Sequence, residues 1–314
     1  MLHMNLIKKF KTSFQIKFSN DYRFLCHLMG SKTIVYDSNS WEKIAELSKP
    51  KNPSCIQFSQ NNDYLYIKNT IGTICMYDTS EFQLIKTIKS NKKVHFVEGD
   101  FALTNAPFTI LDTLKTKCGN QLALVNIDSG EYKILTDFDD SITLFDYHHM
   151  IPSENSYLFT LSYVSNKTDS REYKLLKVSN VNSEPSITII ENQLNLHWNS
   201  AIYDSIHQVY ILINNFEITI MDSTFDNVLK QKTILENNND TDKGYFYHIN
   251  QSNNGQFIIL TYSNQIYILR YDDLQVIRVE NLPYACLAQF SDNNQYLLIG
   301  TWNNGYILEN DLIE

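Results

Sequence analysis

The 314-residue sequence predicts an all-β fold in which seven small sheets, the blades, form a seven-bladed β-propeller. Three observations predict this fold. A turn-and-strand pattern recurs about every 40 residues, the length of four short strands with their turns. A Tyr-Asp pair follows several copies of that pattern, and the start of the chain matches a strand that the last repeat lacks. The spacing leaves counts of six or eight blades open.

Four segments show the repeat most clearly. Each has a serine, a polar turn and then an aromatic and aliphatic strand; the serines are Ser19, Ser59, Ser252 and Ser291. A second landmark comes later in the unit, where an aromatic residue ends a strand and Asp opens the next turn. Its copies are Tyr36-Asp37, Tyr77-Asp78 and Tyr271-Asp272.

We therefore expect a single propeller domain over residues 1–314. Its blades are expected near residues 13–47, 54–88, 93–136, 141–191, 197–235, 245–280 and 285–314. The third and fourth units are irregular. Residues 104–121 look like an inserted loop, and Ser165 to Glu172 lengthens a turn. Lysines are frequent in the fourth strand of the units, where they would protect an exposed sheet edge.

The two ends of the chain supply an independent argument. The last unit ends after its third strand, from Gly305 to Leu308. Asn5 to Lys11 matches Gln83 to Lys89, which is assigned as the fourth strand of the second unit. Residues 1–11 are therefore expected to supply the missing strand of the last blade and remove its open edge.

These landmarks resemble a divergent WD-repeat β-propeller. In that family a Trp-Asp pair ends the third strand and a Phe-Ser-Pro-Asp-Gly turn is usual, whereas this chain has Tyr-Asp and no proline in the turn. The resemblance implies a rigid interaction platform, usually without catalysis. The departures imply that the buried Asp-His-Ser-Trp network of the family is missing and that blades pack more by apolar contacts.

Charge narrows the class of partner. The chain has 26 Lys and Arg against 35 Asp and Glu, a net charge of −9. Nucleic acids and anionic membrane surfaces both need concentrated cations, so we expect neither as a partner. The charge allows a basic protein partner without demanding one.

Cysteine usage and the N-terminus point to the cytoplasm. The five cysteines are widely spaced and lie mostly in apolar runs, which argues against a disulfide framework. Met1 to Lys11 has no apolar stretch of signal-peptide length, and no segment reaches the roughly 18 apolar residues of a membrane span. We expect a soluble cytoplasmic protein.

The sequence contains only weak motifs for catalysis or metal binding. Four histidines recur about one blade apart, namely His95, His148, His197 and His248. Their alignment places them in different registers, so they would not all face the propeller axis and bind a metal. Residues 236–244 fail the spacing of a calcium loop, and nothing fixes a partner for Asp139-Asp140. We predict no catalytic residues, no metal and no cofactor.

A binding face is the remaining candidate. In a propeller, the loops between second and third strands and the loops that enter each blade lie at one face. Aromatic and cationic side chains anchor interfaces, and these loops carry Trp302, Tyr262, His27, Lys68, Trp198, Tyr245, Tyr284 and Arg171. For each aromatic residue the alternative is packing on a neighbouring blade.

These observations favour a non-catalytic scaffold that mediates protein–protein interaction through its loop face. A basic partner, sequestered or inhibited by occlusion, fits this hypothesis. The alternative is a channel-centred enzyme of the metal-dependent lyase or hydrolase type, or a small-ligand binder, that uses inward-facing histidine and acidic residues.

Overall fold

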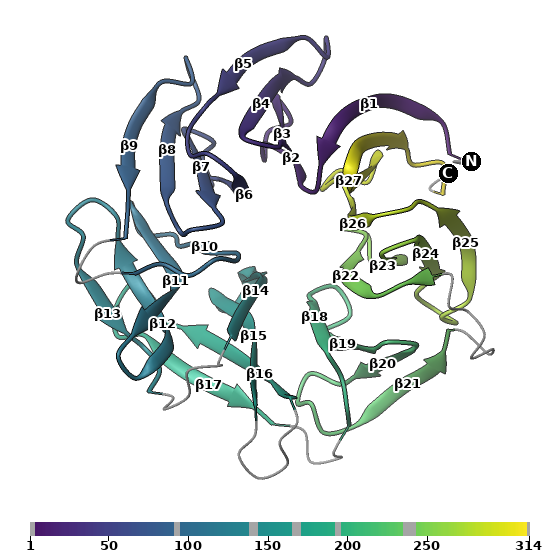
Figure 1. Cartoon of the computed structure of the whole chain (residues 1–314). Helices are drawn as coiled ribbons and strands as arrows, with labels where there is room; N and C mark the ends of the chain where they lie inside the picture. The colour runs from purple at the N-terminus through teal and green to yellow at the C-terminus, as the bar shows by residue number, and fades with distance from the viewer. Residues whose placement is uncertain are drawn as a thin grey trace. The chain divides into compact units, whose positions relative to one another are not determined.

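A computed structural model describes residues 4–90, 95–137, 144–164, 171–191, 196–234 and 243–312. Within this part of the chain, all strands pair antiparallel and form seven sheets, so the fold is an all-β, seven-bladed propeller (Figure 1). The predicted fold class is confirmed. Among the described residues, helical structure is limited to the 3-10 turn Pro152–Glu154 and a 3-10 residue at Lys243, and no helix there is long and apolar enough to cross a membrane.

Contacts divide the chain into two compact units. Unit 2, Ser48–Gln193, contains three blades whose strands pair in chain order. The first has β6 (Pro53–Phe58), β7 (Tyr64–Asn69), β8 (Ile74–Asp78) and β9 (Leu84–Ile88). The second has β10 (Ala102–Leu103), β11 (Thr109–Thr116), β12 (Gly119–Asn126) and β13 (Tyr132–Ile134). The third has β14 (Leu144–Ile151), β15 (Ser156–Val164), β16 (Arg171–Ser179) and β17 (Ser186–Ile190).

Unit 1 joins Met1–Leu47 to Leu194–Glu314 and contains four blades. One has β2 (Ile16–Phe18), β3 (Phe24–Met29), β4 (Lys32–Asp37) and β5 (Lys43–Leu47). Another has β18 (Ser200–Asp204), β19 (Val209–Asn214), β20 (Glu217–Met221) and β21 (Val228–Thr233). The next has β22 (Phe246–Gln251), β23 (Phe257–Tyr262), β24 (Gln265–Arg270) and β25 (Val276–Asn281). The last has β26 (Ala285–Phe290), β27 (Tyr296–Glu309) and β1 (Leu6–Ser13).

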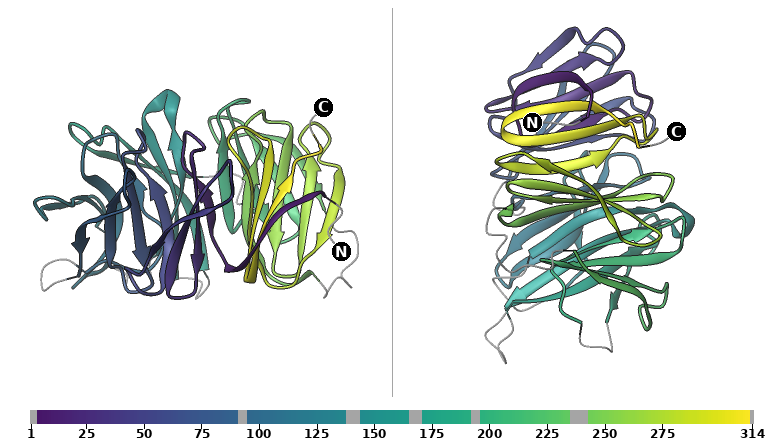
Figure 2. Two further views of the ribbon diagram at one scale, coloured as in Figure 1. Left: turned by 90° about the horizontal axis from the view of Figure 1, so that it is seen from above. Right: turned by 90° about the vertical axis from the view of Figure 1, so that its right-hand side faces the viewer.

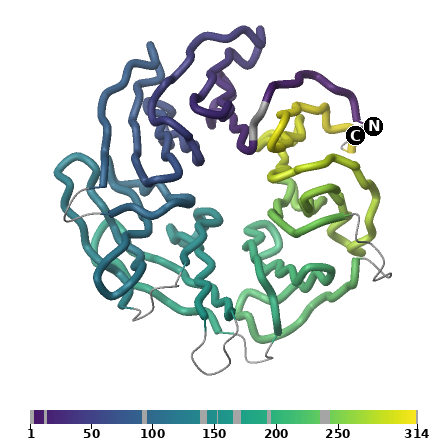
Figure 3. The backbone as a smooth tube through the Cα atoms, in the orientation of Figure 1, coloured from purple at the N-terminus to yellow at the C-terminus, as the bar shows by residue number. Residues whose placement is uncertain are grey.

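The N-terminal strand completes the last blade, as the sequence predicts. The continuous element β27 pairs with β26 through residues 297–301 and with β1 through residues 301–308. Lys9 lies opposite Tyr306, and Phe10 lies opposite Gly305. The purple and yellow strands run side by side in the right-hand view of Figure 2 and in the tube of Figure 3.

The repeated serine builds the turn between the first and second strands of a blade. In all four copies its Oγ accepts a hydrogen bond of 2.9–3.0 Å from the backbone N–H five residues later. The same hydroxyl donates to an Asp or Asn side chain two residues later at 2.7–2.8 Å. The repeated polar residues therefore satisfy the turn's own backbone groups and are not free to bind a ligand.

Apolar layers between neighbouring blades form the core. One layer packs Tyr66 and Met76 of the blade β6–β9 against Ile110 and Val125 of the next blade. Another packs Ile259 and Ile268 of the blade β22–β25 with residues of β26 and β27. Second and third strands are covered on both faces, and in β23, where all six residues are buried, this gives a nearly continuous apolar run.

The predicted insertion at residues 104–121 is wrong. Residues 104–108 form a turn, and the segment continues into the regular strands β11 and β12. The segment reads as a loop because it contains the charged residue Asp112. That carboxylate is buried within β11, where an ion pair with Lys68 compensates its charge. Of the lengthened turn expected at residues 165–172, positions 165–170 lie outside the described residues.

Candidate functional site

Four aromatic residues lie on loops that backbone hydrogen bonds link across three blades of unit 1, at the end where the chain enters each blade, and we call them the aromatic row. This aromatic row consists of Tyr245, Tyr284, Trp302 and Phe14. Tyr245 is 82% exposed, Tyr284 57% and Trp302 58%, whereas Phe14 is half-buried. Trp302 and Phe14 are in contact, with ring centroids 6.1 Å apart. The sequence analysis identified three of the four residues, and it missed Phe14.

Backbone hydrogen bonds fix the loops that carry the row. Trp302 N donates to Tyr284 O at 3.0 Å, which joins the hairpin of β27 to the loop before β26. Tyr245 O accepts from Ser263 N at 2.8 Å, and Tyr245 N donates to Ser263 Oγ at 3.1 Å. Ser263 O in turn accepts from Ala285 N at 3.0 Å, so the carrying loops are linked to one another.

A glycine allows one of these loops its close approach. Gly244 has φ +79°, and a Cβ at this position would lie 1.8 Å from Ser263 Oγ. Any other residue would be strained at this φ and would displace the Ser263 hydroxyl that accepts from Tyr245 N. The exposed tyrosine is thus held by a closely packed loop, although its own side chain extends into solvent.

Four of the predicted site residues lie inside the blades instead. Tyr262 at the end of β23 donates its hydroxyl to Asn215 O, and its ring packs against Phe246 and Tyr267. The His27 ring in β3 lies between Phe10 and Tyr36, at centroid distances of 4.8 Å and 5.6 Å. Trp198 and Lys68 are also buried. Within the described structure these side chains have packing roles.

Lys68 makes a fully buried ion pair in unit 2. Its Nζ in β7 lies 2.6 Å from Asp112 Oδ1 in β11, and both side chains are 0% exposed. Burial raises the pKa of Asp112 to about 6, although the ammonium and a hydrogen bond from Thr113 N oppose the shift. The second oxygen of the carboxylate has no hydrogen-bond partner among the described residues.

Arg171 is exposed at the start of β16, in unit 2. Its Nη1 donates to Ser162 Oγ of the adjacent strand at 3.0 Å. Its charge acts on Asp146, a carboxyl group whose pKa is raised by surrounding protein and by Asp100, while Arg171 opposes the rise. Arg171 belongs to unit 2, whereas the aromatic row lies in unit 1.

The four recurring histidines have separate environments. His148 Nε2 lies 2.5 Å from Thr160 Oγ1, and His248 Nδ1 lies 3.3 Å from Ala288 O of the next blade. His95 and His197 are exposed. Among the residues that the structure describes, no three His, Cys, Asp or Glu side chains converge as a metal site would require. Asp139, Asp140 and residues 236–242 lie outside the described residues.

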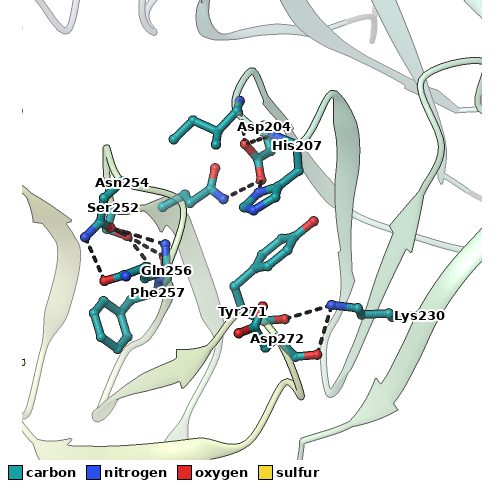
Figure 4. Close-up of polar contacts among 11 residues, drawn as sticks. Asp204, His207, Lys230, Ser252, Asn254, Gln256, Phe257, Tyr271 and Asp272 are labelled. Carbon is teal, nitrogen blue, oxygen red and sulfur yellow. Dashed lines mark hydrogen bonds and ion pairs between the residues drawn. The ribbon is translucent and has the colours of Figure 1, made fainter.

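A polar contact that the sequence analysis missed joins two blades of unit 1 (Figure 4). Asp204 Oδ1 accepts from the backbone N–H groups of Ile206 and His207, and its Oδ2 lies 2.5 Å from His207 Nδ1. Gln251 of the next blade donates to the same Oδ2 at 2.6 Å. The His207 ring stacks on Tyr271, with centroids 4.0 Å apart and planes within 8°.

The other face of Tyr271 carries a cation. Lys230 Nζ lies 4.6 Å from the ring centroid and donates to Asp272 O at 2.9 Å. Burial, followed by the charge of Asp204, raises the pKa of Tyr271 to about 12. The Tyr-Asp landmark is thus held between histidine and lysine. One sequence signal for this contact was available. Asp204 aligns with the repeated serine, and like that serine it accepts hydrogen bonds from the backbone of its turn.

Comparisons with known proteins address the fold. No protein-family model matches the chain, and no curated protein matches its sequence. The β-propeller domain of Cps50 (Swd1) from Myceliophteria thermophila is similar, with a TM-score of 0.71 and 11% sequence identity over 98% of this chain and 99% of that one. Hydrazine synthase from Kuenenia stuttgartiensis is similar with a TM-score of 0.68 and 11% identity, over 99% of this chain and 98% of that one.

Likeness at this identity shows the fold alone. The seven blades and the similarity to the Swd1 propeller domain bear out the predicted WD-repeat-like β-propeller.

Proposed function

We propose that the protein is a non-catalytic scaffold of the cytoplasm that binds another protein through the aromatic row of Tyr245, Tyr284, Trp302 and Phe14. The observation that carries the proposal is the exposure of three large aromatic side chains on loops that hydrogen bonds link to one another. Single exposed apolar residues are ordinary, whereas a cluster is typical of an interaction site. Rigid aromatic anchors also lose little conformational entropy on binding.

Charge and thiol chemistry refine the proposal. The net charge of −9 favours a basic protein partner, because opposite charge accelerates encounter. The same charge disfavours nucleic acid and anionic membranes. All five cysteines are free, which suits a reducing compartment.

Affinity purification from extracts of the native host tests the proposal. The baits are the unaltered chain, Trp302→Ala and the control Tyr132→Ala, whose ring is 43% exposed on the outer strand β13. We expect a specific protein to be recovered with the unaltered chain and the control and to be lost with Trp302→Ala. A central aromatic anchor contributes about 2 kcal/mol or more, roughly a 30-fold change in affinity. Equal recovery by all three baits would contradict the proposal.

A further inference from the structure

A cavity of about 360 Å³ opens between two blades of unit 2. Its walls come from the first turn of the blade β6–β9, residues 59–64, and the first turn of the blade β10–β13, residues 103–109. First turns lie at the opposite end of a blade from the loop between the second and third strands. The cavity therefore shares no residue with the aromatic row, and it lies at the other end of its blades from their loops between second and third strands.

Two tyrosines of β7 line this cavity. Tyr64 and Tyr66 are two residues apart, so both side chains leave the strand on the same face, toward β10 and β11. Tyr66 is only 3% exposed. Neither hydroxyl has a hydrogen-bond partner among the described residues, although a buried tyrosine hydroxyl usually has one. Each is a donor that a ligand could satisfy.

The Tyr66 hydroxyl remains protonated at neutral pH. Burial, followed by the neighbouring Tyr64, raises the pKa of Tyr66 to about 12. Tyr66 therefore offers a hydrogen-bond donor to the cavity, and a phenol hydroxyl such as that of Tyr64 can donate as well, so the complementary ligand group is an acceptor such as a carbonyl oxygen.

The opposite wall is aromatic and apolar. The Phe108 ring lies 5.8 Å from the Tyr64 ring, beside Leu103 and Pro107. Phe108 O accepts from Ile127 N at 2.8 Å, which fixes the turn that carries the ring. The side chains of Ser59, Asn61 and Thr104 already make hydrogen bonds within their turns. No Asp, Glu, Lys, Arg or His lines the cavity, in a chain of net charge −9.

We propose that this cavity binds an uncharged, proline-containing peptide segment in the polyproline II conformation. Proline rings pack on aromatic side chains, and a polyproline II backbone has no internal hydrogen bonds. Its carbonyl oxygens are available to the hydroxyls of Tyr64 and Tyr66. A charged ligand would lose hydration without gaining a counter-ion here. A sugar would find most of the turn's polar side chains already engaged. The inference goes beyond the proposed function and uses none of the residues of the aromatic row.

The proposal is tested by titrating the full chain with acetylated, amidated hexaproline while its backbone amide chemical shifts are measured by NMR. We expect saturable shifts confined to residues 59–66 and 103–109. Tyr66→Phe and Tyr64→Phe keep the rings and remove one donor each, so each variant should weaken binding by about 2- to 10-fold. The matched control Tyr132→Phe removes an exposed hydroxyl on β13 and should leave the affinity unchanged.

Three outcomes would overturn the proposal. The first is an absence of shifts at these residues with hexaproline. The second is equal binding of an acetylated, amidated Gly-Ser peptide of the same length, or binding of methyl glucoside in place of the proline peptide. The third is unchanged affinity in both Tyr→Phe variants. None of these outcomes bears on the aromatic row, which the affinity purification tests separately.

Discussion

Removal of one partner of the buried Lys68–Asp112 ion pair should cost more stability than removal of both partners. Its formation takes two charges out of water, and the raised pKa of Asp112 shows that burial outweighs the attraction of the ammonium for this carboxylate. Loss of the whole pair and loss of one partner therefore have different consequences. A variant without Lys68 leaves a carboxylate buried with no counter-ion, whereas a variant without both has no buried charge.

Lys68→Met should destabilise the protein by about 3–5 kcal/mol at neutral pH, measured by urea denaturation. The loss should shrink as the pH falls toward about 4. A carboxyl group whose pKa is raised in the folded state stabilises that state when protonated, and this contribution is lost as pH rises through the folded pKa. In the variant the folded pKa of Asp112 would lie above its present value of about 6, because the lysine that opposes the rise is gone.

The double variant Lys68→Met with Asp112→Leu is the control for this prediction. It should recover most of the lost stability and show no such pH dependence, since neither side chain titrates. A loss in Lys68→Met that stays constant between pH 4 and pH 8 would contradict the argument.

Side-chain placement was the least predictable part of the candidate site. The repeat places Trp302 in a loop between second and third strands, and Tyr245 and Tyr284 at blade entrances. Lys68 and Tyr262 occupy similar positions in the repeat, but they lie in β7 and β23 with buried side chains, whereas Trp302 in β27 is exposed. A difference of one residue in a strand turns the side chain to the other face. The partner of Lys68 is 44 residues away, so no local pattern could reveal it.

Three outer strands attach their blade to the next one through a lysine side chain. Lys86 on β9 donates to Asp128 O at 2.8 Å, and Lys230 on β21 donates to Asp272 O at 2.9 Å. Lys8 on β1 donates to Trp41 O at 3.2 Å. The sequence analysis expected these lysines to protect exposed sheet edges. In the structure they also hold neighbouring blades together. The equivalence of Lys8 with Lys86 also follows the alignment that predicted β1 as a fourth strand.

Deletion of residues 1–11 should strongly destabilise the protein, with a melting temperature lower by about 10 °C or more, measured by circular dichroism. The deletion removes most of the partner strand of β27, and with it Phe10, which is buried against Ile16 and Ile307. Loss of a buried phenylalanine side chain alone costs about 3–5 kcal/mol.

Deletion of residues 1–3 alone is the matched control, because β1 begins at Leu6. This shorter deletion should leave the transition near that of the full chain. An unchanged melting temperature after removal of residues 1–11 would contradict the role assigned to β1.

For the whole molecule, the length of a blade and the contribution of β1 to the last blade could be read from the sequence because four blades repeat the same local hydrogen bonds. Ser19, Ser59, Ser252 and Ser291 cap the same turn, so their spacing measures the blade directly. The contact of His207 with Tyr271 depends on packing between blades, and it could not be read in this way. Local chemistry thus predicts the repeat, and tertiary packing decides which polar side chains meet.

The five free cysteines allow the burial of both units to be tested in solution. Cys118 is exposed and should react fastest with a disulfide-exchange reagent. Cys286 should react more slowly, because burial raises its pKa to about 11 and lowers the thiolate fraction. Cys26 in unit 1 and Cys55 and Cys75 in unit 2 are buried, and their modification requires opening of the blades that enclose them. Mass spectrometry of labelled peptides should therefore show these three thiols unmodified until denaturant is added. Rapid labelling of any of them in native conditions would mean that its blade is not packed as described.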